Sequence, residues 1–397
     1  MEHVGAIQYR QSSLFLDKNA TQNRKLSRAK LIAHETSHMW FGDLVTMKWF
    51  NDVWMKEVFA NFMADKIMNP VFPEVNHRLN FMMSHYPSAY SEDRTKGTNA
   101  IRQYLGNLKN AGSLYGRIIY NKAPIMMRQL EYLLGEDAFK EGIQEYIKTY
   151  QNSNADWNEL VSILDKKSPG NIKSWSDVWV NSSGRPVFYE EIELNEKGNV
   201  TKFVIHQKAE DGSNKIWTQS FKIKLKDKRG YEKVINIKNM GKSFDITSAT
   251  KDFKPGQVLY NTNGFGYGVF PVYKKEINTY KNISDEVSRG YQFINLYENM
   301  LNGEVSPLET YNVFLDAIQQ EKNELITSYL SGRIQNIFWT FLTEEQQHKV
   351  QEKIESTVFE LVEKELPKNI KKTLFNLYQA IAISDKGKEN LYEVWLK

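Results

Sequence analysis

The sequence HETSH, from His34 to His38, opens the stretch that decides the fold, and the stretch continues as MWFGDLVTMKWFNDVWMK up to Glu57. On a helix, residues four positions apart lie on one face, so His34 and His38 can direct two imidazoles at one metal ion. Glu35 is offset by one position and can act on a metal-bound water without binding the metal. This H-E-x-x-H pattern is typical of zinc hydrolases.

A third zinc ligand should come from a second element, and Glu57 is the candidate because it follows His38 after eighteen residues. The pattern predicts one helix over residues 28–41, capped by Ser27 and ended by Gly42. Glu57 would then lie on a second helix that faces this one.

That second helix is predicted over residues 53–68. Asn51 or Asp52 would cap it, and Asn69-Pro70 would stop it. The alternative is an accidental H-E-x-x-H pattern in an ordinary helix. A correctly spaced glutamate, Glu57, argues against that alternative.

Length and composition limit the remaining possibilities. A chain of 397 residues predicts two or three domains, and 41% hydrophobic residues indicate globular domains with large cores. The formal net charge of +4 is too small to favour nucleic acid or an anionic membrane as partner. Without cysteine there is no disulfide and no thiolate zinc ligand. The sequence contains no apolar run of about eighteen residues, so it predicts no transmembrane segment. Localisation stays open between cytoplasm and cell envelope.

The stretch resembles the M1 family of zinc aminopeptidases, which are gluzincins of the aminopeptidase N type. Residues 42–46, GDLVT, are similar to the family's G-N-L-V-T, and residues 54–60, WMKEVFA, are similar to its W-L-N-E-G-F-A. The resemblance implies one zinc ion per chain, a water in the open coordination position, and Glu35 as the base that takes the proton of that water. The zinc ligands would be His34, His38 and Glu57.

Two departures from the family pattern concern the helix of Glu57. Val58 replaces the usual glycine, and Ala64 stands where the family has a glutamate that braces a zinc-bound histidine. Such a partner fixes the tautomer and orientation of the imidazole. Asn61, one turn after Glu57, could supply the acceptor instead; the alternative is that Asn61 is a solvated helix residue.

The first ten residues, MEHVGAIQYR, resemble the family's exopeptidase motif, G-A-M-E-N followed by W-G-L-I-x-Y-R. Only Met1, Glu2 and His3 of its first part are present, and His3 replaces asparagine. The resemblance implies that Glu2 binds the free α-amine of the substrate through a charge-assisted hydrogen bond. The alternative is an incidental acid at a chain end. We also expect the family's N-terminal domain to be missing.

Residues 118–124, IIYNKAP, resemble the family's catalytic Y-x-K-G-A segment. This implies that Tyr120 donates to the oxyanion of the tetrahedral intermediate. Tyr115 is a weaker rival because it lacks the following lysine. An ordinary half-buried tyrosine is the alternative for both.

Beyond the turn cluster at residues 182–186, apolar and polar residues alternate over 201–207 and 219–225, as in strands of a β-sheet. From Ser284 onward the pattern is helical. The sequence therefore predicts a mainly α, multidomain protein. Its parts would be a thermolysin-like, N-terminally truncated zinc peptidase domain at 1–183, a small antiparallel β-sandwich at 184–273, and an incomplete α-superhelical segment at 274–397.

Together these patterns predict a zinc-dependent metallo-aminopeptidase that removes the N-terminal residue of a peptide through a zinc-activated water. Its partner would be a peptide with a free N-terminus. Two alternatives stay open. One is a zinc endopeptidase of another gluzincin type, and the other is a non-catalytic scaffold whose helical region binds a partner. The preferred first residue and the oligomeric state are not predicted.

Overall fold

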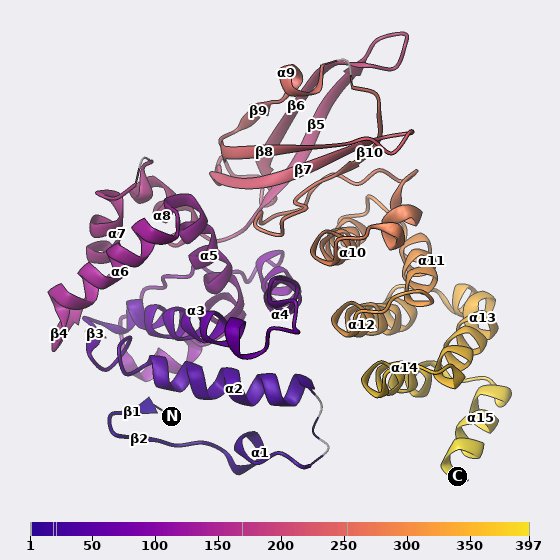
Figure 1. Ribbon diagram of the computed structural model, residues 1–397, viewed down its shortest axis with the longest axis horizontal. Helices are drawn as coiled ribbons and strands as arrows, with labels where there is room; N and C mark the ends of the chain where they lie inside the picture. Colours follow the sequence, from indigo (N-terminus) through magenta and orange to yellow (C-terminus); the bar gives the residue numbers. More distant parts are fainter. Residues whose placement is uncertain (1, 19, 21, 169, 252, 397) are drawn as a thin grey trace. The chain divides into compact units, whose positions relative to one another are not determined.

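The computed structural model describes residues 2–18, 20, 22–168, 170–251 and 253–396 (Figure 1). Met1, part of the predicted amine-binding motif, lies outside the described residues. Helices make up most of the described chain and the strands form four small sheets, so the predicted mainly α class is confirmed. The chain divides into two compact units. The first comprises Met1–Ile223, Lys233–Pro255 and Asn263–Gly268, and the second comprises Lys224–Glu232, Gly256–Thr262 and Val269–Lys397.

The first unit contains most of the shorter helices. They are α1 (Gln11–Leu14), α2 (Gln22–Ser37), α3 (Val53–Val71), α4 (His77–Asp93), α5 (Ala123–Leu134), α6 (Glu136–Tyr150), α7 (Trp157–Asp165), α8 (Ile172–Trp179) and α9 (Thr247–Thr250). Two 3-10 helices, Phe50–Asp52 and Leu108–Leu114, and a π-helix, Ile118–Lys122, lie between them.

Helix α2 packs against α3, and this pair carries the H-E-x-x-H stretch (Figure 1). The predicted start of the first helix at residue 28 was wrong. Good helix formers such as Lys25 and Leu26 extend the helix upstream of Ser27. The α-helix ends at Ser37, but the amide of His38 still donates to the carbonyl of His34 at 3.3 Å. The one-turn spacing of the two histidines is therefore kept.

Helix α3 begins at Val53 as predicted, but the proline at position 70 does not stop it. The amide of Phe72 still donates to the carbonyl of Met68 at 3.1 Å, so only the hydrogen bond of the proline itself is lost. Neither predicted cap acts as one. Asp52 accepts from the guanidinium of Arg102 at 2.8 Å instead.

A closed polar cluster ties the π-helix to α4. The ammonium of Lys122 lies 2.8 Å from the carboxylate of Asp93, and both side chains are fully buried. Lys122 also donates to the carbonyl of Gly184 at 2.9 Å. Asp93 further accepts from Thr98 Oγ1 at 2.7 Å and from the hydroxyl of Tyr267 at 3.1 Å. Every partner belongs to the first unit, so the cluster fastens distant stretches of its chain together.

Six strands follow α8. They are β5 (Pro186–Leu194), β6 (Val200–Ala209), β7 (Gln219–Asp227), β8 (Glu232–Met240), β9 (Ser243–Asp245) and β10 (Pro255–Leu259). They form two three-stranded sheets in the orders β5-β6-β9 and β10-β7-β8. Strand β6 is antiparallel to both β5 and β9. The two predicted strands thus lie inside β6 and β7, as the alternation indicated.

The remaining strands are very short. Strands β1 (Glu2–His3) and β2 (Ala6–Ile7) form an antiparallel hairpin. Strand β3 (Val45–Met47) pairs in parallel with β4 (Ser153–Ala155). Strand β3 immediately follows the turn after the second histidine, so this pairing anchors the chain between α2 and α3.

The second unit is helical over most of its length. After a 3-10 helix at Ile277–Asn282, it contains α10 (Glu286–Leu301), α11 (Pro307–Ile318), α12 (Glu324–Thr340), α13 (Glu344–Glu363), α14 (Lys368–Ile381) and α15 (Asp385–Leu396). Thr343 and Gln346 form a complete capping box at the start of α13, and Ser306 caps α11 by accepting from the amide of Glu309 at 3.2 Å. No helix in the described part of the chain is both long and apolar enough to cross a bilayer.

Candidate metal centre

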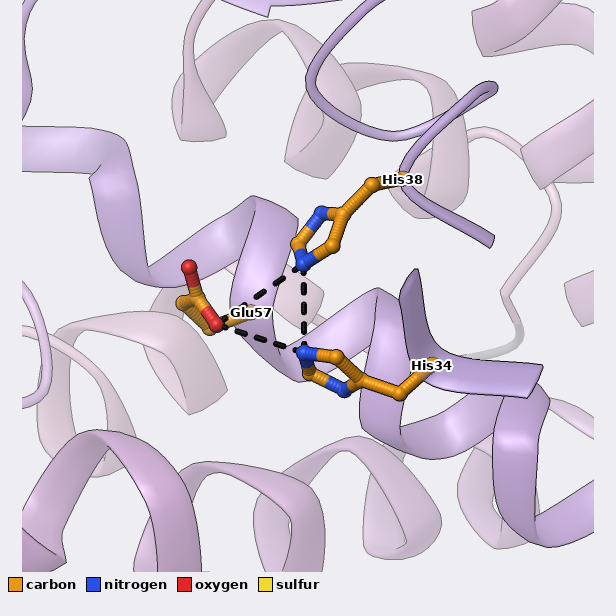
Figure 2. Close-up of side chains that lie close together, drawn as sticks. All are labelled: His34, His38 and Glu57. Atoms are coloured by element: carbon orange, nitrogen blue, oxygen red, sulfur yellow. Dashed lines mark hydrogen bonds and ion pairs between the residues drawn. The ribbon is translucent and has the colours of Figure 1, made fainter. Parts of the chain in front are cut away.

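Three predicted ligands converge between α2 and α3 (Figure 2). The Nε2 atoms of His34 and His38 lie 3.1 Å apart. Glu57 Oε2 lies 3.6 Å from the first and 3.9 Å from the second of these nitrogens. These separations allow one ion to touch all three atoms at the zinc–ligand distances of about 2.0 to 2.2 Å. Two imidazoles and one carboxylate are also the donor set of catalytic zinc sites, so the residues fit this metal.

The other nitrogen of each ring has a partner that fixes its orientation. His34 Nδ1 lies 3.1 Å from Asn61 Oδ1, and His38 Nδ1 lies 3.0 Å from the carbonyl oxygen of Phe41. Both partners are acceptors, so each Nδ1 carries the proton and each Nε2 lone pair faces the centre. The hydrogen bond considered for Asn61 is therefore present, while Ala64 is fully buried and offers no acceptor.

Electrostatics hold the ligands in their metal-binding forms. Burial lowers the pKa of His38, which favours the neutral imidazole. Burial raises the pKa of Glu57, but the adjacent imidazole of His34 and the positive charge of Lys56 outweigh it, and the net pKa is lowered. A neutral imidazole and an ionised carboxylate are the forms that bind metal ions.

The three ligands open into a cleft of about 580 Å³, a volume typical of small-molecule sites. The predicted base, Glu35, and the predicted amine anchor, Glu2, both line it. Their carboxylate oxygens and a ring nitrogen of His38 lie within 4.8 Å of one another. The remaining lining residues are Ser27, Lys30, Leu31, His34, His38, Lys56, Glu57, Asn61, Tyr115 and Tyr120. The structure thus brings every predicted site residue into one cleft.

Both candidate tyrosines line this cleft. Tyr120 lies on the π-helix, a distortion that is frequent at functional sites, and Tyr115 follows a 3-10 helix. Their ring centroids are 6.3 Å apart, and the two side chains are 37% and 38% exposed. Burial and the negative charge of Glu57 raise the pKa of Tyr120, so its phenol stays protonated as a donor requires.

Lys56 also lines the cleft, and the sequence did not predict it as a site residue. Its ammonium forms an ion pair with the carboxylate of Glu2 and lies 3.3 Å from Glu57 Oε1. Burial lowers the pKa of Lys56, but the two glutamates raise it by more. The net pKa is raised, so the ammonium stays charged. Burial likewise raises the pKa of Glu2, and Lys56 brings it down to about 2. The available signal was a lysine in place of the asparagine of the W-L-N-E pattern.

Residues 1–179 match the peptidase family M1 domain. The chain is 25% identical over 340 residues to "Probable aminopeptidase 1" of Sulfurisphaera tokodaii, a match that covers 85% of this chain and 42% of that protein. It is 33% identical over 224 residues to "Puromycin-sensitive aminopeptidase" of Caenorhabditis elegans, covering 55% of this chain and 23% of that protein. Over 211 residues it is 34% identical to "Aminopeptidase N" of Streptomyces lividans, covering 53% and 24%. The chain therefore spans less than half the length of these curated relatives.

Proposed function

Because this chain belongs to peptidase family M1 through residues 1–179, we propose that it is a zinc-dependent metallo-aminopeptidase that removes the N-terminal residue of peptides. The observation that carries the proposal is the triangle of His34 Nε2, His38 Nε2 and Glu57 Oε2, with no side longer than 3.9 Å. These three residues would hold one zinc ion per chain. The names of the similar proteins, which are aminopeptidases, support the same reaction.

Each cleft residue has a separate role in this proposal. When bound, zinc lowers the pKa of a water toward about 7 and polarises the scissile carbonyl. Glu35 accepts the proton of the attacking water and passes it to the leaving amine, which is typically worth about 10² to 10⁴ in rate. Tyr120 donates its phenol proton to the developing oxyanion in a hydrogen bond. Glu2 binds the α-ammonium of the peptide and so directs cleavage to the first residue.

The domain organisation expected from the sequence is part of the proposal. The catalytic domain would comprise residues 1–183, a β-sandwich residues 184–273, and a helical segment residues 274–397. Rings of Phe188 on β5 and Phe221 on β7, from different sheets, lie 5.6 Å apart between centroids, as expected for two sheets that share a core.

Metal content and hydrolysis, measured on the same preparation, test the function. We expect about one zinc per chain by elemental analysis and hydrolysis of aminoacyl-arylamides. Chelation should abolish hydrolysis and added zinc should restore it. As a control, His206→Ala removes a histidine on β6 outside the cleft and should change neither readout. A chain that hydrolyses these substrates equally well after complete zinc removal would overturn the proposal, and so would a zinc-loaded chain that hydrolyses none.

A further inference from the structure

The ammonium of Lys56 sits between two carboxylates that the proposed function uses for other purposes. It pairs with Glu2, the amine anchor, and lies 3.3 Å from Glu57 Oε1, on a metal ligand. The Lys56 side chain is only 16% exposed, and the Glu2 side chain is 28% exposed. The pair is therefore partly withdrawn from water. Charge-assisted hydrogen bonds are stronger in such an environment than in bulk water.

The chemistry of this pair matches that of the expected substrate contact. A peptide with a free N-terminus presents a primary ammonium to Glu2, and Lys56 presents the same group from within the chain. A carboxylate already bound to one ammonium has less to gain from a second, and the two cations repel each other. Lys56 and the peptide N-terminus are thus alternatives at Glu2.

The position of Lys56 is held by its surroundings. It lies on α3 directly before Glu57, so its backbone cannot leave the site while α3 stays folded. Its stem passes close to Gly42, where a Cβ would lie 3.3 Å from Lys56 Cδ. Gly42 has a φ of +127°, which favours glycine, so the tight approach of backbone and stem is built into the turn.

We propose that Lys56 is a specificity-determining residue whose ammonium occupies the α-amine position at Glu2. A free peptide N-terminus then binds only by displacing Lys56, and the cleft discriminates weakly between substrates with a free and a blocked N-terminus. This inference rests on the proposed function, because it takes Glu2 as the amine anchor.

Lys56→Asn tests the inference by a gain of discrimination. The KM for a leucyl-arylamide should fall about tenfold or more, the magnitude of one charge-assisted hydrogen bond, whereas the KM for the N-acetylated substrate should not change. Zinc per chain should stay the same, which excludes an effect through Glu57. Lys48→Gln removes a lysine outside the cleft and should leave the ratio of the two KM values unchanged.

A double-mutant cycle shows whether the effect passes through Glu2. In the native background, Glu2→Gln should change the ratio of the KM for the free substrate to the KM for the blocked substrate by less than about threefold. In the Lys56→Asn background the same change should remove the gained discrimination. An equally large effect of Glu2→Gln in both backgrounds would overturn the inference, as would a Lys56→Asn enzyme with the native ratio.

A binding measurement separates this inference from the proposed function. Calorimetry on the metal-free chain needs no turnover, and the probes are leucinamide and N-acetyl-leucinamide. Lys56→Asn should bind leucinamide at least about tenfold more tightly than the native chain, with no gain for the acetylated probe. If no variant hydrolyses peptides but this gain is seen, the proposed function fails and the occupancy of Glu2 by Lys56 stands. Equal leucinamide binding by both chains overturns the inference alone.

Discussion

The first unit contains two polar clusters, each built around a lysine with little exposure, and they differ in how they meet solvent. Lys122 is fully buried and its Asp93 partner is too. Lys56 lines the cleft, is 16% exposed, and shares its charge between Glu2 and Glu57. The first cluster is closed, because its members satisfy one another. The second is open, because a substrate or an ion can compete for its carboxylates.

Exposure of the cluster to solvent separates structural from functional charges in this fold. Removing a partner from a closed cluster leaves a buried charge uncompensated and should affect stability. Removing a group from the open cluster leaves a site that solvent can reach and should affect catalysis or binding. Variants of Asp93 and of two tyrosines test this division.

The largest effect should come from Asp93→Ala in the closed cluster. The change leaves Lys122 buried without its counter-ion, and such a loss typically costs about 3 to 5 kcal/mol of unfolding free energy. Urea unfolding measures it. Lys386→Ala removes an exposed pair with Glu389 at 2.8 Å and should leave stability nearly unchanged. If Asp93→Ala and Lys386→Ala were equally mild, the closed cluster would not be a structural element.

Tyr120 in the cleft and Tyr267 in the closed cluster should respond differently to loss of the hydroxyl. Tyr120→Phe should lower kcat by about 10² to 10³ with little change in KM, because oxyanion charge develops only in the transition state. Tyr267→Phe removes a hydroxyl that donates to Asp93 at 3.1 Å and should lower stability by about 1 kcal/mol with kcat retained. Steady-state kinetics and unfolding of both variants decide. A change in KM alone would make Tyr120 a substrate-packing residue, and a larger kcat loss in Tyr115→Phe would exchange the two roles.

The smallest effect concerns the pH dependence of stability. Burial lowers the pKa of His85, which lies 3.7 Å from Asp65. The unfolded chain therefore takes up this proton first as pH falls below about 6.5, and stability is lost toward acid. His85→Phe should reduce that slope by up to about 1.4 kcal/mol per pH unit. Urea midpoints between pH 7.5 and 5 measure it, and an unchanged slope would show that His85 does not contribute.

The sequence predicted the convergence of His34, His38 and Glu57 better than the surroundings of these residues. Spacing alone sets the geometry of His34 and His38, because i and i+4 share a helix face, and it survived an error in the start of α2. Cap patterns were less reliable. Asp52 was expected to cap α3 but instead bonds to Arg102, fifty residues away, because a tertiary partner outweighs a local one.

The partner of Lys56 could not be predicted from the sequence, because it too is a tertiary contact. A lysine stem is long and flexible, so what it touches depends on where the β1–β2 hairpin comes to lie against α3. The departure from W-L-N-E was visible in the sequence, but its contact with Glu2 was not. The hydrogen bond of Asn61 was easier to predict from the sequence, because Asn61 shares a helix face with Glu57.

In the proposed function the open cluster is a zinc site with a separate base, and a paired measurement distinguishes ligand from base. Zinc content and turnover are measured on Glu35→Gln and Glu57→Ala in parallel. Glu35→Gln should keep its zinc and lose nearly all turnover, whereas Glu57→Ala should lose most of its zinc together with turnover. An active Glu35→Gln enzyme would rule out Glu35 as the base, and a Glu57→Ala chain with full zinc and activity would rule out Glu57 as a ligand.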